Sequence, residues 1–182
     1  AEEFAPFDNN VTTEEPDIEN LRNTGNGDEK WGVRVVITQD DVTQIEPGSG
    51  GVAFPYSFND GVDTPAFVFN SGENSAANTI SHEVGHTLGL EHDGPGIGGY
   101  YPGHGTGDTS WGTIMGGGLG QSITQWSKGE YSGADNTGQD DLEVITTDNG
   151  FTYRFDNHGD INTQATALTS SNTNNVSAFG II

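Results

Sequence analysis

Three histidines and one glutamate lie close together between residues 82 and 92. On a helix, His82 and His86 lie one turn apart on the same face, so both imidazoles can reach one metal ion. Glu83 then lies beside that ion rather than on it, which is where a general base must be to take a proton from metal-bound water. The pattern predicts a metal-dependent hydrolytic site.

A third histidine completes the pattern after a glycine. A straight helix cannot bring a third ligand to the same ion at the right angle, but Gly89 permits a sharp change of direction that returns His92 to the metal. Three protein ligands leave one position open for water, which is typical of a catalytic rather than a structural zinc site. Imidazole ligands suit zinc, although cobalt and copper would also bind them. We therefore predict one catalytic zinc ion held by His82, His86 and His92.

The helix that positions these ligands is visible in the periodicity of the sequence. Apolar residues recur at steps of three and four along one helix face, at Ala76, Ala77, Ile80, Val84 and Leu88. Asn74 or Ser75 is expected to cap the first turn, and Gly89 to end the helix. This helix would carry the first two histidines and the glutamate.

Short strands are expected before this helix. The apolar residues at positions 31–38 predict a buried strand, those at 50–54 and 66–69, each bounded by Pro, Gly or Asn, predict two more, and residues 9–13 are a further candidate. A short helix is expected at residues 16–21. Together these elements indicate an α/β domain.

The second half of the chain is less regular. Residues 93–120 run without periodicity and are rich in glycine, and a loop this long in a compact domain is usually functional. A last helix is expected at residues 139–145, with acidic residues in its first turn where the helix dipole favours them. Beyond Arg154 the chain becomes polar and rich in Asn, Thr and Ser.

The composition excludes several classes of function. The chain has 182 residues, the size of one ordinary domain, and no cysteine, so thiol catalysis and cysteine zinc sites are excluded. Its net charge of −22 repels phosphate backbones, so nucleic acid is not an expected partner. No stretch approaches the roughly 18 apolar residues of a membrane span. The first residues lack the basic and apolar regions of a signal peptide, so an exported protein would already have lost its signal and any propeptide.

The segment from His82 to Asp93, His-Glu-Val-Gly-His-Thr-Leu-Gly-Leu-Glu-His-Asp, resembles the extended zinc motif of the metzincin metallopeptidases. Asp93 is similar to the reprolysin (adamalysin) branch, and the wider run, over roughly residues 4 to 160, is similar to bacterial reprolysin-like peptidases. The resemblance implies a Met-turn beneath the zinc, for which Thr-Ile-Met-Gly at residues 113–116 is the candidate, with Met115 below the ligands. Asp93 would support the site from behind by orienting backbone or a ligand.

This resemblance implies an α/β metzincin fold. Residues 1–92 would form an upper subdomain with a twisted mixed five-stranded sheet and the active-site helix. Residues 93–154 would form an irregular lower subdomain with the Met-turn and a final helix. Residues 155–182 would be a polar tail or the start of a β-sandwich domain that has been removed. One departure stands out, because astacins and serralysins carry a tyrosine at the position of Gly117, so a tyrosine ligand or oxyanion donor from that place is excluded.

The resemblance also implies a secreted zinc endopeptidase that acts on proteins or peptides, and a monomer is expected. Glu83 would take a proton from the attacking water and return it to the leaving amine. Pro55 cannot donate to a strand ladder, which suits an edge strand just before it. By resemblance, that edge lies beside the zinc and pairs with an extended substrate. This substrate strand would comprise Gly51, Val52, Ala53 and Phe54.

Two other functions stay open from the residues alone. The fold could be a catalytically silent metal-binding or adhesion module, although a binder needs no base at Glu83, or it could be a zinc amidase of cell-wall peptides. His104 could bind a second metal or line the cleft, but a loop histidine bonded to backbone is the commoner case. Asp156 and Asp160 do not match the calcium-loop pattern, so no specific calcium site is predicted, and calcium elsewhere stays open.

Overall fold

A computed structural model describes residues 32–38, 48–70, 72–96, 99–153, 159, 161 and 163–167. The chain divides into two compact units, Ala1–Phe151 and Thr152–Ile182, and every helix and strand named below belongs to the first. The strand expected at residues 9–13 and the helix expected at 16–21 lie outside the described residues, as do most of residues 155–182. The expected division into domains and subdomains stays a prediction.

A mixed three-stranded sheet lies before the main helix. β1 (Val35–Ile37) runs parallel to β3 (Ala66–Val68), and β2 (Gly51–Val52) runs antiparallel to β3, so β3 is the central strand. Ala66 and Val68 are both fully buried, as the alternation of side chains in a strand requires of one covered face. Within the described residues β2 is an edge strand. A five-stranded sheet stays a prediction.

The strand β2 is shorter than the sequence pattern indicated. It ends at Val52, and Ala53 and Phe54 lie outside it. Beyond Pro55 the chain bonds to the end of the main helix instead, because the Tyr56 N–H donates to the His86 carbonyl at 3.0 Å. The edge available for a partner strand is therefore shorter than expected.

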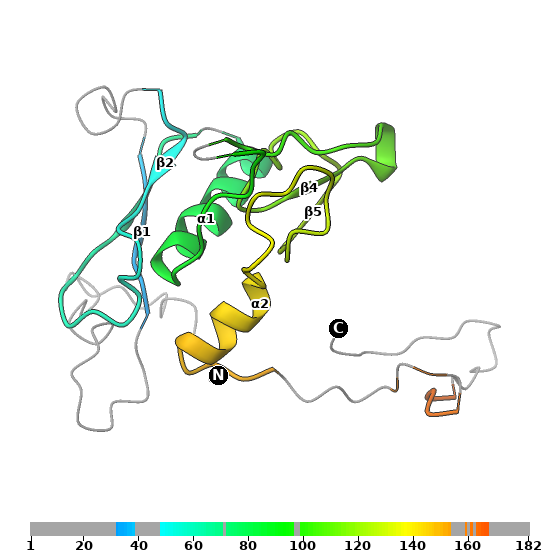
Figure 1. Cartoon of the computed structure of the whole chain (residues 1–182). Coiled ribbons are helices and arrows are strands. Elements are labelled where there is room, and N and C mark those ends of the chain that lie inside the picture. The colour runs from blue at the N-terminus through cyan, green and yellow to red at the C-terminus, as the bar shows by residue number, and fades with distance from the viewer. Residues whose placement is uncertain are drawn as a thin grey trace, which may run out of the picture. The chain divides into compact units, whose positions relative to one another are not determined.

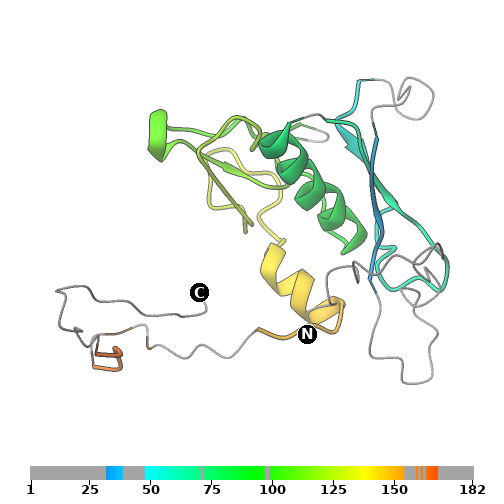
Figure 2. The ribbon, with the colours of Figure 1, turned by 180° about the vertical axis from the view of Figure 1, so that it is seen from behind.

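The helix α1 (Glu73–Thr87) carries the candidate site. It packs against β3 and lies between the three-stranded sheet and the β4–β5 segment, as Figures 1 and 2 show from opposite sides. The expectation of a cap at Asn74 or Ser75 was wrong. The N-cap is Gly72, no side chain caps the helix, and Asn74 lies inside it with its carbonyl bonded to Asn78.

Two short strands follow the metal-binding segment. β4 (Trp111–Thr113) and β5 (Ile123–Gln125) pair in parallel, and a turn of 3-10 helix, η3 (Gly107–Thr109), precedes them. The expectation that residues 93–120 lack regular structure was therefore wrong in part. Strands of three residues, one with a glycine at its centre, are too short for an alternating pattern to be recognised.

The last helix begins at Asp141. α2 (Asp141–Glu143) continues as a π-helical turn, η4 (Val144–Asp148). The Asp140 carboxylate caps it by accepting from the N–H groups of Leu142 and Glu143 at 3.2 and 3.3 Å. Among the described residues, no helix is long and apolar enough to cross a membrane.

The middle of α1 carries a glycine where it meets a buried methionine. Met115 is 0% exposed, and a Cβ at Gly85 would lie 2.5 Å from its sulfur. The same Cβ would lie 3.3 Å from the Trp126 ring. The absence of a side chain at Gly85 therefore lets the segment after β4 approach the helix closely.

We expect Gly85→Ala to lower the free energy of unfolding. Alanine favours a helix interior by about 1 kcal/mol, but forcing a methyl group into this contact costs about 1–3 kcal/mol. The check is urea denaturation of the metal-free protein, with Ser81→Ala as control because, among the described residues, the Ser81 hydroxyl bonds only to the Ala77 carbonyl of its own helix. An unchanged or higher midpoint in Gly85→Ala would contradict the packing described.

Candidate metal centre

The structure brings the three predicted histidines together. His82 and His86 project from α1 one turn apart, and His92 reaches them from the segment beyond the helix. One ring nitrogen of each lies within 4.8 Å of the others, and the His86 and His92 Nε2 atoms are 2.9 Å apart. Within the described residues this is the only group of three such side chains placed to hold a metal ion.

Gly89 makes the turn that brings His92 back. Its φ of 99° lies in the left-handed region, which favours glycine. A Cβ at this position would also lie 2.9 Å from the Tyr56 ring. The Leu90 N–H then donates to the Gly85 carbonyl at 3.0 Å, closing the helix end. The predicted turn at Gly89 is therefore confirmed.

Backbone carbonyls fix the orientation of two of the rings. His82 Nδ1 lies 2.8 Å from the Ile114 carbonyl, and His86 Nδ1 lies 2.8 Å from the Leu90 carbonyl. A carbonyl only accepts, so each Nδ1 carries the hydrogen and each Nε2 presents a lone pair. His86 Nε2 and His92 Nε2 lie 2.9 Å apart, and three converging imidazole nitrogens are a donor set that fits a zinc ion.

The environment keeps the imidazoles neutral. Burial lowers the pKa of His82 to about 4, with smaller contributions from His86 and His92. Burial also lowers the pKa of His86 and of His92 below the ordinary value. Neutral imidazole is the form that binds a metal ion, so the histidines are ready to bind at neutral pH.

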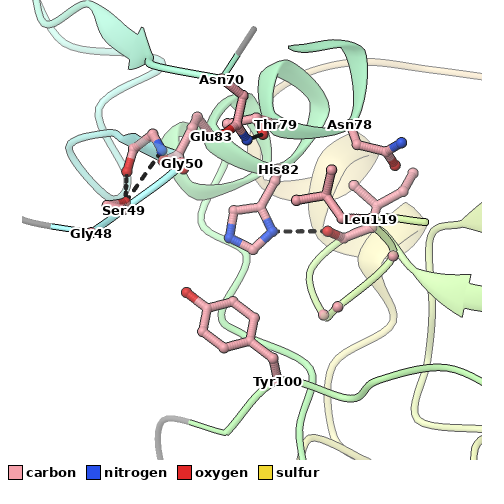
Figure 3. A pocket seen from close by; sticks show the side chains of 15 residues that line it. Gly48, Ser49, Gly50, Asn70, Asn78, Thr79, His82, Glu83, Tyr100 and Leu119 are labelled. Carbon is pink, nitrogen blue, oxygen red and sulfur yellow. Dashed lines mark hydrogen bonds between the residues drawn. The ribbon is translucent and has the colours of Figure 1, made fainter. Parts of the chain in front are cut away.

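A cavity of about 320 Å³ opens beside His82 and Glu83 (Figure 3). Glu83 is 5% exposed, and burial raises its pKa to about 7. The strand β2 passes directly beside it, since a Cβ at Gly51 would lie 2.8 Å from the Glu83 Oε1. The cavity therefore joins the carboxylate, one histidine and the predicted substrate strand.

Residues 6–93 match the family model of the reprolysin-like metallo-peptidases, family M12B. This segment is similar to the M12B reprolysin-like family. The match confirms the resemblance drawn from the motif, and the three-histidine cluster fits the zinc ion of such metallopeptidases. No curated protein matches the chain. The family match ends at Asp93, so the parts of the site that come after this residue lie outside it.

A turn at residues 113–116, which follow the matched segment in the sequence, supports the histidines. The Gly116 N–H donates to the Thr113 carbonyl at 3.2 Å, and Met115 is fully buried under α1. The neighbouring Ile114 carbonyl is the one that holds the His82 ring. The turn therefore lies where the sequence placed the Met-turn candidate.

Asp93 fastens the chain after His92 to this turn. Its N–H donates to the Met115 carbonyl at 2.9 Å, and its carbonyl accepts from the Tyr101 N–H at 2.7 Å. Its side chain is 1% exposed and accepts a long hydrogen bond from the Tyr131 hydroxyl at 3.5 Å. Among the described residues the Asp93 side chain makes no hydrogen bond to a histidine ring, so its predicted support of the site stays a prediction.

A second buried carboxylate lies near Asp93. Asp141 is 1% exposed and accepts from the Ser127 N–H at 2.9 Å. Burial, followed by the charges of Asp93, Asp140 and Glu130, raises the pKa of Asp141 to about 7. One oxygen of Asp141 has no hydrogen-bond partner within the described residues. The sequence places Asp141 in the first turn of the last helix, and the structure buries it there.

The sequence did not predict where two aromatic side chains, His104 and Tyr100, lie relative to the histidine cluster. His104 lies outside the cluster, where its Nδ1 bonds to the Tyr101 hydroxyl at 2.7 Å and its backbone pairs with Trp111. Tyr100 was missed altogether, and its hydroxyl lies 3.0 Å from His92 Nε2. No local motif marks Tyr100, and only its place in the glycine-rich loop after the histidines could have drawn attention to it.

We expect His92→Ala to weaken zinc binding by the protein more than about 100-fold, and His104→Ala to leave it nearly unchanged. The first change removes a ring of the cluster, whereas the second removes a ring bonded to Tyr101. Competition with a chromophoric chelator measures both affinities. Equal losses of affinity would show that the third ligand is wrongly assigned.

We expect Asp141→Asn to stabilise the protein more at pH 8 than at pH 5. The pKa of Asp141 is about 7 in the folded state, above the ordinary value of an unfolded aspartate, so its charged form destabilises the fold. This cost is absent below about pH 4 and grows as pH rises to about 7. Asparagine can still accept from the Ser127 N–H, so a gain on the order of 1 kcal/mol is expected at pH 8.

Thermal unfolding of metal-free protein at the two pH values measures this difference. Asp140→Asn is the matched control, because asparagine caps a helix as well as aspartate does and Asp140 is not buried. A stabilisation by Asp141→Asn that is larger at pH 5 than at pH 8 would reverse the sign and exclude a buried charge as its cause.

Proposed function

We propose that this chain is a secreted zinc-dependent endopeptidase that cleaves internal peptide bonds of proteins, with Glu83 as its general base. The observation that carries the proposal is the cluster of three neutral histidines, one of which, His82, lines a cavity together with the buried Glu83. A zinc ion bound by His82, His86 and His92 would supply a Lewis acid that polarises the scissile carbonyl and makes water more acidic. Export is supported by the family resemblance alone, and fractionation of the producing cells tests it.

Glu83 is suited to accept a proton. Its carboxylate has no hydrogen bond or ion pair to the described residues, so its lone pairs are free for a water molecule in the cavity. A base is most effective when its pKa lies near the working pH, and burial raises the pKa of Glu83 to about 7. After the attack, the same carboxyl group would return the proton to the leaving nitrogen.

The strand β2 is suited to bind a substrate backbone. It is an edge strand within the described residues, and Gly50 and Gly51 line the cavity without side chains that would block it. An extended peptide can add to such an edge through main-chain hydrogen bonds. We propose that Gly51 and Val52 form this edge, continued without regular pairing by Ala53 and Phe54.

We further propose that the turn at residues 113–116 is the Met-turn of the family. The support is its position, with Met115 buried against Gly85 and the Ile114 carbonyl at the His82 ring. Met115 would then hold the floor of the site rather than take part in the reaction.

We expect Glu83→Gln to retain one zinc ion per chain and to lose about 10² to 10⁴ of its turnover number. The substitution leaves the histidines and the side-chain volume in place but removes the proton acceptor. Metal analysis and initial rates on a quenched fluorescent peptide measure the two effects. Glu91→Gln, an exposed glutamate just before His92, is the control and should retain its rate. Appreciable turnover in Glu83→Gln would exclude it as the base.

A blocked peptide tests the proposed function directly. No Lys or Arg lines the described cavity, so nothing there would clamp a terminal carboxylate, and strand addition needs no free end. We expect an acetylated and amidated peptide of about ten residues to be cut about three or more residues from either end. Mass spectrometry of the products decides the result. Release of single residues from free-ended peptides, with blocked peptides intact, would make the enzyme an exopeptidase.

A further inference from the structure

Tyr100 is exposed, yet its hydroxyl is directed at the histidine cluster. The side chain is 51% exposed, and its hydroxyl oxygen lies 3.0 Å from His92 Nε2. Its ring centroid lies 4.3 Å from that of His92 and 5.9 Å from that of His82, and Figure 3 shows its hydroxyl end facing the His82 ring. A tyrosine held only by packing would have no reason to point its polar end here.

The backbone beside Tyr100 is firmly held. Tyr101 donates its N–H to the Asp93 carbonyl and accepts from the Gly117 N–H, both at 2.7 Å. The Tyr101 ring is 8% exposed and stacks on Tyr131 with centroids 4.2 Å apart. These contacts fix the chain next to Tyr100, so its hydroxyl is presented to the site with little entropy left to lose.

The partner of this hydroxyl would change when the site is used. In the structure it bonds to the His92 nitrogen that belongs to the metal-binding set. Once that lone pair is taken by an ion, the hydroxyl must find another acceptor. Tyr100 lines the same cavity as Glu83, so the acceptor available there is a substrate in that cavity. A neutral tyrosine donates a hydrogen bond, whereas an ionised glutamate only accepts one.

We propose that Tyr100 is a catalytic residue whose hydroxyl donates a hydrogen bond to the oxygen of the scissile carbonyl as that oxygen gains negative charge. The assignment rests on the proposed peptidase function and divides the work in the cavity, with Glu83 handling the proton and Tyr100 stabilising the developing charge. Tyr100 would supply a donor that Gly117 cannot. The residue lies beyond the segment that matches the family, so its role comes from the geometry of this chain.

The test compares Tyr100→Phe with the wild-type zinc-loaded enzyme. Phenylalanine keeps the ring packed against His92 and removes only the hydroxyl. Loss of one donor to a developing oxyanion lowers kcat by about 10²-fold, and KM should change little because the bond strengthens only in the transition state. Calorimetry supplies a readout independent of turnover. An uncleavable phosphinic peptide, whose anionic oxygen replaces the carbonyl oxygen, should bind about 10- to 100-fold more weakly, whereas a product peptide should bind as before.

Controls separate this proposal from its alternatives. Tyr56→Phe should match the wild type, because Tyr56 is 67% exposed and its hydroxyl has no hydrogen bond among the described residues. Unchanged phosphinic-peptide affinity in Tyr100→Phe would overturn the assignment. A loss of zinc affinity in that variant would also overturn it, since Tyr100 would then act on the metal or on His92. If the wild type neither cleaves peptides nor binds the phosphinic peptide, the peptidase function itself fails.

Discussion

The candidate metal centre depends on how closely the turn at residues 113–116 approaches α1. Gly85 has no Cβ, and this lets the Met115 sulfur lie only 2.5 Å from the point where a Cβ would be. From this position the Ile114 carbonyl reaches the His82 ring at 2.8 Å, and the Met115 carbonyl accepts from the Asp93 N–H at 2.9 Å. One close contact therefore orients the first histidine directly and anchors the chain immediately after the third.

The second histidine is held by a separate device. Gly89 turns the chain in the left-handed region, and this brings the Leu90 carbonyl back to His86 Nδ1 at 2.8 Å. Both ring anchors are backbone carbonyls, which cannot donate, so they select the tautomer that a metal ion needs. Main-chain contacts therefore orient two of the three predicted ligands.

The sequence predicted the parts of this site that follow from local geometry. The spacing of His82 and His86 on a helix, and the turn at Gly89, depend on neighbours within a few residues. The support beneath them does not, because the contact between His82 and Ile114 spans 32 residues. The burial of Asp141 and the place of Tyr100 likewise come from packing between distant segments, and no periodicity signals either. The helix start was predicted wrongly because Gly72 begins the helix without the side-chain cap that usually marks one.

Two carboxylates, Asp140 and Glu83, differ in role, since the first is structural and the second is suited to chemistry. Asp140 is stabilised locally, since it caps α2 from a position that is only partly buried. Glu83 has no comparable stabilising contact. It is 5% exposed, and it lies beside imidazoles that burial keeps neutral. Its pKa therefore rises to about 7. In a chain of net charge −22, a solvated glutamate at this position would cost the fold less. The ionised form of a buried acid becomes more favourable when a cation lies near it, and the three histidines are placed to hold one. The acid whose charged form destabilises the fold is therefore the group that the proposed reaction requires.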